Sequence, residues 1–343
     1  MAIDDEIEET KRKLKETPVN KGTETARARL KSKIARLKEK KEKKQKESGG
    51  GESGYAVKKR GDASVALVGP PSVGKSTLLN KLTNADSEVA NYEFTTLNVV
   101  PGMMKYKGAN IQILDVPGLI GGAAKGKGGG KEVLSVIRSC DMVVMMVDDK
   151  KLNGLERMKK ELYNAGIRMN THEPNMRLKK TGRGGIKINS TCELSLDKGT
   201  IKDVIKDNGF LNCHVVIRED LSIDELIDGI MKNRVYIPSI SVLNKIDQLE
   251  NDELMELERM ENLIAISASQ EKNLDELKEE IWEKLNLMRI YMKKINKEPD
   301  KEEPLIVKRD SSISEIQKNL PGNFQRNLKY ARIWGKSSKF SGQ

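Results

Sequence analysis

Cysteine and histidine are scarce in this sequence, with three cysteines and two histidines among 343 residues. Cys140, Cys192 and Cys213 show no pairing or metal-ligand spacing, and neither His172 nor His214 completes a zinc pattern with them. The shortage excludes a disulfide-stapled scaffold and a structural zinc module, and it fits a reducing compartment.

Long apolar runs are also missing. No stretch reaches the roughly 18 apolar residues that a membrane-spanning helix needs, and no secretory signal opens the chain. We therefore expect no membrane partner and a cytoplasmic location.

Acidic residues are in the minority, and the imbalance lies at the N-terminus. The net charge is +11, and residues 1–60 contain 19 Lys and Arg against 11 Asp and Glu, so the rest is close to balance. A clustered basic arm favours attraction to a polyanion, with a solvated helix as the alternative. Aromatic residues, only 4% of the chain, do not interleave with these lysines, which indicates phosphate contact without base stacking.

Two helical segments form this basic arm. Apolar residues recur at helical spacing in residues 3–17 and 23–47, and Pro18 separates the segments. We predict a helical hairpin over residues 1–47. A Gly- and Ser-rich stretch then predicts a flexible linker over residues 48–61.

Short apolar runs separated by helical stretches follow. This alternation predicts an α/β fold with a mostly parallel sheet, covered on both faces, over residues 62–166 and 234–295. Residues 167–233 are too many for a loop and carry their own strand and helix signals, so we expect an inserted α+β subdomain. Inside it, two runs flanking the glycines at 182–185 predict a β-hairpin. Residues 300–343 are expected to form a last small module.

The stretch "GPPSVGKST", residues 69–77, fits the phosphate-binding pattern G-x-x-x-x-G-K-S. Glycines let backbone N–H groups turn inward around a β-phosphate, and a strand before the loop and a helix after it complete the expected context. Lys75 is expected to reach the β- and γ-phosphates, and Ser76 to offer its hydroxyl to Mg²⁺. The residues expected to bind phosphate here are Pro71, Ser72, Val73, Gly74, Lys75, Ser76 and Thr77.

Two short motifs further along the chain are typical of guanine recognition. In "NKID", Asp247 can accept hydrogen bonds from guanine N1–H and the 2-amino group, donors that adenine lacks. Asn244 can hold N7 and bridge back to the phosphate loop, and the stem of Lys245 can cover the base. The stretch "SAS", Ser267, Ala268 and Ser269, can offer the backbone N–H of Ala268 to guanine O6.

Two more segments predict loops that sense a γ-phosphate. In "FTTLN", Thr95 or Thr96 can give Mg²⁺ a hydroxyl and hold the γ-phosphate through its N–H, and we favour Thr96. In the D-x-x-G pattern, Asp115 would reach Mg²⁺ through water and Gly118 would donate its N–H to the γ-phosphate. Together with Ser76, these residues predict a Mg²⁺·GTP switch.

The residue after Gly118 is Leu119, where many switches carry the glutamine that orients the attacking water. Hydrolysis would then depend on Lys75, Thr96, Gly118 and an additional group. Two readings stay open, a slow GTP hydrolase and a GTP-dependent RNA- or ribosome-binding scaffold with negligible turnover. A small-molecule kinase is a third, which the N-K-x-D and D-x-x-G motifs argue against.

The stretches "GPPSVGKSTLLNKLTN", "YEFTTLNVVPG", "DVPGLIGGAAKGKGGGKEVLSVIRSCD" and "NKID" together resemble the Obg-like translation-associated GTPases. Within that group the chain is similar to the developmentally regulated GTP-binding protein family, and the similarity extends over most of the sequence. It includes "HVVIREDLSIDELID" near the end of the insertion and "KYARIWGKSSKFSGQ" at the C-terminus.

The resemblance implies an insertion folded like a ribosomal S5-type unit and a C-terminal TGS domain, a ubiquitin-like β-grasp module. That module is expected to be incomplete, because the family's TGS domain continues beyond the last residue; "KYARIWGKS" predicts one of its strands. The resemblance also implies ribosome or rRNA association through the basic arm, a monomer off the ribosome, and slow GTP turnover. Partner proteins or a monovalent cation such as K⁺ would stimulate turnover, although Ser72 stands where potassium-binding relatives have asparagine.

Overall fold

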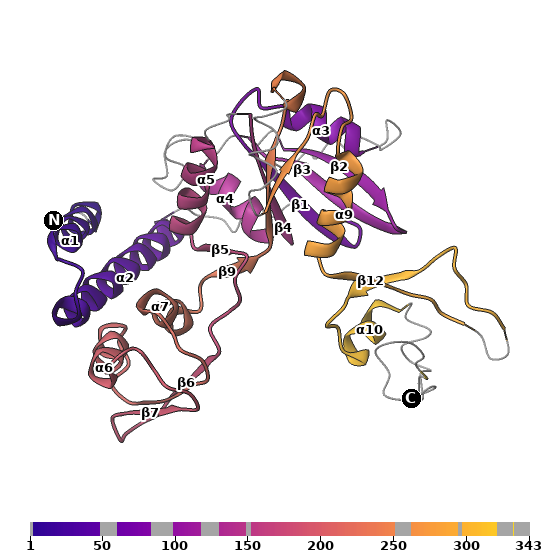
Figure 1. Ribbon diagram of the computed structural model, residues 1–343. Coiled ribbons are helices and arrows are strands. Elements are labelled where there is room, and N and C mark those ends of the chain that lie inside the picture. Colours follow the sequence, from indigo (N-terminus) through magenta and orange to yellow (C-terminus); the bar gives the residue numbers. More distant parts are fainter. Residues whose placement is uncertain are drawn as a thin grey trace. The chain divides into compact units, whose positions relative to one another are not determined.

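The computed structural model describes residues 3–48, 60–83, 99–117, 130–148, 152–250, 262–293, 297–320 and 332 (Figure 1). The chain divides into two compact units, each built from segments distant in the sequence. The first unit comprises residues 1–57, 119–139 and 156–238, and the second comprises residues 58–118, 140–155 and 239–343.

A six-stranded sheet forms the centre of the second unit. Its strand order is β11-β10-β4-β1-β3-β2, and every neighbouring pair is parallel except β2 and β3. This confirms the predicted mostly parallel α/β sheet. The strands are β1 (Ala63–Val68), β2 (Val100–Tyr106), β3 (Ala109–Asp115), β4 (Met142–Val147), β10 (Ser239–Leu243) and β11 (Leu263–Ala265).

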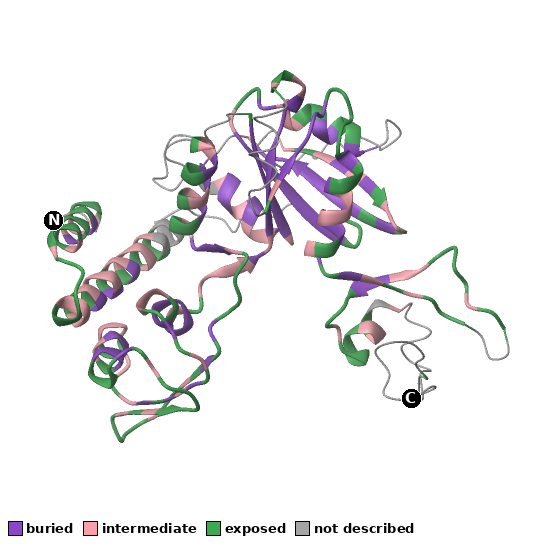
Figure 2. Ribbon diagram, viewed as in Figure 1, coloured by how far each residue is buried: buried purple, intermediate pink, exposed green. Residues whose placement is uncertain are grey.

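Burial of the central strands explains their continuous apolar sequences. Every residue of β1, β4 and β10 is buried, and Figure 2 shows this sheet largely in purple. Within the same unit, α3 (Lys75–Leu82) and α9 (Leu274–Lys284) contribute buried leucines, an isoleucine and Trp282 to this core. Strands that are buried on both faces of a sheet are apolar at successive positions, and do not alternate between apolar and polar residues.

The C-terminal segment of the second unit adds a small antiparallel pair, β12 (Leu287–Ile290) with β13 (Leu305–Lys308). Helix α10 (Ile313–Asn319) follows, and a capping box between Ser312 and Glu315 fixes its start. The strand predicted from "KYARIWGKS" lies outside the residues that the structure describes.

The first unit begins with helices α1 (Ile3–Glu16) and α2 (Glu24–Ser48), which pack against each other. It also contains α4 (Gly130–Ser139), most of α5 (Asn153–Asn164), and the parallel pair β5 (Ile167–Met169) and β9 (Val235–Ile237). Strands β5 and β9 are the two points at which the chain enters and leaves the insertion.

The insertion contains β6 (Met176–Lys180), β7 (Ile186–Ser190), α6 (Lys198–Asp207), β8 (Cys213–Ile217) and α7 (Ile223–Met231). Its sheet has the order β6-β8-β7, so the hairpin predicted around residues 182–185 is wrong. The glycine segment is held by Asn212 just before β8, whose backbone oxygen and side chain accept from the N–H groups of Thr181 and Gly185. Strand β8 therefore lies between the two strands that the pattern paired.

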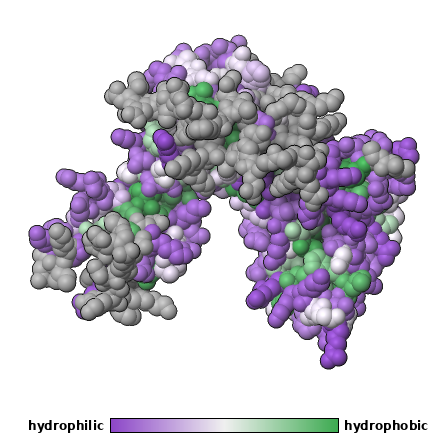
Figure 3. Space-filling view, turned by 180° about the vertical axis from the view of Figure 1, so that it is seen from behind, coloured by the Kyte–Doolittle hydropathy of each residue, from purple (hydrophilic) through white to green (hydrophobic). Residues whose placement is uncertain are grey.

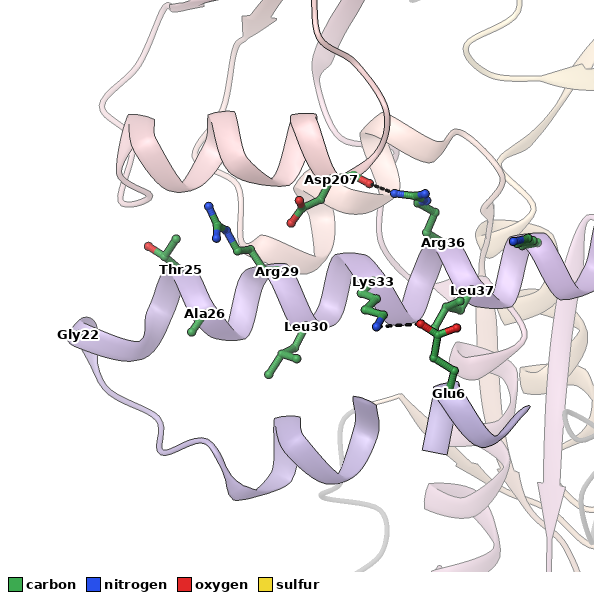
Figure 4. A pocket seen from close by; sticks show the side chains of 11 residues that line it. Glu6, Gly22, Thr25, Ala26, Arg29, Leu30, Lys33, Arg36, Leu37 and Asp207 are labelled. Carbon is green, nitrogen blue, oxygen red and sulfur yellow. Dashed lines mark hydrogen bonds and ion pairs between the residues drawn. The ribbon is translucent and has the colours of Figure 1, made fainter. Parts of the chain in front are cut away.

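Helix α2 docks on the insertion through part of its basic charge (Figure 4). Arg29 pairs with Asp203 at 2.7 Å, and Arg36 donates to the backbone oxygen of Asp207 at 2.7 Å. On the opposite side of α2, Lys33 pairs with Glu6 of α1 at 2.8 Å. A groove of about 910 Å³ runs along α2 among these groups.

A buried ion-pair cluster lies close to the entrance and exit of the insertion. The carboxylate of Asp228 on α7 accepts two bonds from Arg168, at 2.5 and 3.0 Å, and one from Arg234 at 2.8 Å. The side chain of Asp228 is only 4% exposed. The Tyr163 ring stacks against Arg168 with the guanidinium carbon 3.7 Å from the ring centre. Such a cluster is stable only while every partner is present.

Where the surface in Figure 3 is coloured, it is mainly hydrophilic, with hydrophobic side chains gathered in smaller patches. Among the described helices, none combines the length and apolarity required to cross a membrane.

Candidate nucleotide-binding site

The phosphate loop joins β1 to α3 and depends on glycine at two positions. Gly74, directly before α3, has a φ of +97°, and a Cβ there would lie 2.3 Å from Nδ2 of Asn244. A Cβ on Gly69 would lie 2.6 Å from the backbone oxygen of Met146. Any larger residue would therefore clash with fixed neighbours, which explains the spacing of the two glycines.

Lys75 points back into the loop from the first turn of α3. Its ammonium group donates to the backbone oxygens of Gly69 at 3.1 Å and Pro70 at 3.0 Å. Burial lowers the pKa of Lys75, and the nearby Asp115 carboxylate partly opposes that shift. The loop thus holds one cation above backbone groups at the N-terminus of a helix, an arrangement suited to phosphate.

Ser76 and Asp115 come together at the carboxyl ends of β1 and β3. The Ser76 hydroxyl donates to Oδ2 of Asp115 at 2.6 Å, and Asp115 is 9% exposed. Both are hard oxygen donors, so the pair fits Mg²⁺. No cluster of three or more His, Cys, Asp or Glu capable of holding a metal occurs among the described residues. Mg²⁺ commonly takes one or two protein ligands together with phosphates and water.

Asn244 connects the phosphate loop to the loop after β11. Its Nδ2 donates to the Val73 backbone oxygen at 2.8 Å, and its Oδ1 accepts from the Ala268 N–H at 3.0 Å. All three residues are at most 4% exposed. The N–H assigned to guanine O6 from the sequence is thus engaged by Asn244 in this structure.

The remaining predicted base-binding side chains lie around Asn244. Oδ1 of Asp247 accepts from the Ser267 hydroxyl at 2.5 Å, and that hydroxyl lies 3.1 Å from Oγ of Ser269. Lys245 has a φ of +65° and donates to the Ser72 backbone oxygen at 2.9 Å. The two motifs separated in sequence are therefore adjacent at one edge of the sheet.

Asp148 is a site residue that the sequence analysis missed. Its carboxylate lies 2.5 Å from Nζ of Lys245 and holds that side chain against the phosphate loop. A signal was present, because Asp148 is the first residue after β4, whose carboxyl end lies beside that of β10. Polar residues at such strand ends meet at one edge of a parallel sheet.

Four residues named from the sequence fall outside the described part of the chain: Thr95, Thr96, Gly118 and Leu119. Pro71 and Thr77 are described and exposed. The structure therefore brings together the phosphate-loop and base-loop residues and the Ser76–Asp115 pair.

Comparison with protein families gives two matches along the chain. The model described as 50S ribosome-binding GTPase matches residues 64–178. A model described as the C-terminal region of the MMR_HSR1 domain matches residues 183–287.

Full-length relatives are also similar. An uncharacterized GTP-binding protein of Halobacterium salinarum is 47% identical, covering 100% of this chain and 95% of that protein. One from Methanocaldococcus jannaschii is 47% identical over 100% and 89% of the two chains. Developmentally-regulated GTP-binding protein 2 of Homo sapiens is 42% identical over 100% and 95%.

Proposed function

The chain belongs to the developmentally regulated GTP-binding protein family and is a GTPase, and from that premise we propose that it is a Mg²⁺-dependent switch acting on ribosomes. The observation that carries the proposal is the Asn244 bridge between the phosphate loop and the base loops. Through this bridge, recognition of the base and binding of the phosphates are mechanically linked.

We assign guanine selectivity to Asp247. Its carboxylate is held by the Ser267 hydroxyl at the correct edge of the sheet for a base that offers two donors. The aliphatic stem of Lys245, tethered by Asp148, would cover the base. The Ala268 N–H would be shared between Asn244 and guanine O6 when the base is bound.

We assign the triphosphate and its metal to the phosphate loop. Lys75 would exchange its two backbone acceptors for β- and γ-phosphate oxygens, and the backbone N–H groups of residues 72–77 would surround the β-phosphate. Ser76 would ligate Mg²⁺, with Asp115 acting through water and Thr96 as the second hydroxyl ligand. The metal would neutralise charge that develops on the phosphates.

Hydrolysis is proposed to be slow without assistance, because Leu119 can neither donate nor accept a hydrogen bond. Thr96 and Gly118 would hold the γ-phosphate and the water through backbone groups. A monovalent cation such as K⁺ or an activating protein would supply the missing charge.

Ribosome or rRNA binding is proposed for the basic arm, a helical hairpin formed by α1 and α2. Exposed lysines such as Lys40 and Lys44 carry charge toward solvent, and the matched family is described as ribosome-binding. We further propose an S5-like fold for the insertion, a TGS-like fold for the C-terminal segment, and a monomeric, cytoplasmic protein away from the ribosome.

Phosphate release from GTP by the full chain, in sodium and in potassium, with and without ribosomes, tests the proposal. Stimulation by potassium or ribosomes is expected. Measurable GTP binding with no release under any condition would favour the alternative, a GTP-dependent ribosome-binding scaffold. Removal of residues 1–47 should leave GTP affinity unchanged and weaken co-sedimentation with ribosomes; unchanged sedimentation would refute the role of the arm.

A further inference from the structure

The sheet of the insertion has one covered face and one open face. Residues on the covered face, such as Met176, Val215 and Ile217, form a core with α6 and α7. On the other face, every charged or amide side chain of the three strands is exposed, and four of these five residues are Arg, Lys or His. Figure 2 shows β7 in green and pink, with no buried residue. The open-face positions are Arg177, Lys179, Lys187, Asn189, His214 and Val216.

Strand register arranges these open-face residues in two cross-strand rows. One row is Lys179, His214 and Lys187, and the next contains Arg177 and Asn189 on either side of Val216. Neighbouring strands are about 4.8 Å apart and alternate residues along a strand about 6.7 Å apart. The three permanent cations therefore belong to one surface about 10 Å across.

The six open-face positions include no acidic residue. Among the described residues, none of the three cations forms an ion pair with a carboxylate. The contrast with α2 is clear, because Arg29 and Lys31 are paired with Asp203 and Asp224 of the same insertion. Like charges placed this close repel one another, and an anionic partner would relieve that repulsion.

We propose that this open face binds the phosphodiester backbone of RNA, independently of the basic arm. A protein partner is disfavoured because the face has a single apolar residue, Val216, and no Phe, Tyr or Trp, whereas protein interfaces have an apolar core enriched in those residues. The three cations suit phosphate groups, and the face lacks the row of Phe, Tyr or Trp rings on which successive bases stack, so contact is to the backbone. The Asn189 amide can both donate to and accept from a ribose 2′-hydroxyl.

Two further exposed cations extend the face toward its ends. Arg183 lies in the glycine-containing segment between β6 and β7, and Arg218 directly follows β8. The proposed surface thus involves all three strands of the insertion and none of α1 or α2. The inference rests on the proposed ribosome-binding function, to which this surface adds a second RNA contact. Loss of this contact should leave GTP binding unchanged.

The test compares two full-length variants with equal loss of charge. Arg177→Gln/Lys179→Gln/Lys187→Gln neutralises the open face. Lys198→Gln/Lys202→Gln/Lys206→Gln removes three exposed lysines of α6 in the same subdomain and is the control. The probe is a fluorescently labelled RNA hairpin of mixed sequence, titrated at about 50–200 mM KCl.

For the open-face variant, the slope of the logarithm of the RNA association constant against log salt concentration should become less steep by about two to three. Three phosphate contacts are lost, and each contributes roughly 0.7–0.9 to that slope. The control should change that slope by less than about one. A hairpin of shuffled sequence should bind equally well. Both variants should retain wild-type GTP affinity, which separates this proposal from the nucleotide site.

Equal slopes for the two variants would overturn the proposal. So would a strong preference for one hairpin sequence, because backbone contacts do not read bases. Tighter binding of polyglutamate than of the RNA at equal charge concentration would instead identify an acidic protein as the partner and also overturn it.

Discussion

Replacing Asn244 by alanine should weaken both folding and nucleotide binding. The change removes the donor to the Val73 backbone oxygen and the acceptor of the Ala268 N–H, and both backbone residues are at most 1% exposed. A buried polar group left without a partner costs about 1–3 kcal/mol. The two groups together therefore predict a loss of about 2–6 kcal/mol in the free energy of unfolding.

Urea unfolding followed by tryptophan fluorescence measures the first effect, and titration with a fluorescent GTP analogue measures the second. We expect GTP affinity to fall at least tenfold, because the phosphate loop loses its link to the base loops. Asn244→Asp keeps an acceptor for the Ala268 N–H but places a carboxylate against the Val73 oxygen, so it isolates that half of the bridge. A change in unfolding free energy below about 0.5 kcal/mol in Asn244→Ala would refute the reasoning. Reduced stability with unchanged GTP affinity would show that the bridge supports the fold alone.

Three other changes are predicted. Asp247→Asn should shift preference from guanine to xanthine nucleotides, since an amide can donate where the carboxylate accepts; competition between the two triphosphates measures this, and unchanged guanine selectivity would contradict the assignment. Asp228→Ala should lower the free energy of unfolding by about 3–5 kcal/mol, because it removes the carboxylate that pairs with the buried Arg168 and the half-buried Arg234. The matched change Asp224→Ala, in a pair that is more exposed to solvent, should cost about 1 kcal/mol or less, so equal losses would show that burial is not the cause. The hydrogen bond to Glu279 raises the pKa of Tyr106 from 10.0 to about 12, so the stability that it contributes should be lost as pH rises through that interval. Tyr106→Phe should abolish this part of the alkaline pH dependence, and an identical profile would argue against it.

Local sequence patterns were sufficient to predict much of the nucleotide site and of the sheet that carries it. The spacing of Gly69 and Gly74 predicts a loop that only glycine can build, and the structure gives the steric reason at both positions. Continuous apolar runs predict strands buried on both faces, as β1 and β4 are. These features depend on residues close together in the chain, so the sequence carries them directly.

Strand pairing in the insertion could not be predicted in the same way. Runs on either side of residues 182–185 have the pattern of a hairpin, but β8 lies between them. An alternating pattern determines which face of a strand is buried and does not determine its neighbour. The role of Asp148 was missed for a related reason, because its partner Lys245 is 97 residues away.

The sequence alone determined that the chain contains a phosphate loop, a guanine motif, a buried parallel sheet and a basic N-terminal arm. Tertiary structure decided how the basic charge is used: one side of α2 pairs with the insertion, whereas the cations of the open sheet face stay without acidic partners among the described residues. The physical reason is that composition fixes how much charge a segment carries. Whether that charge is neutralised depends on which distant carboxylates folding brings within a few ångströms.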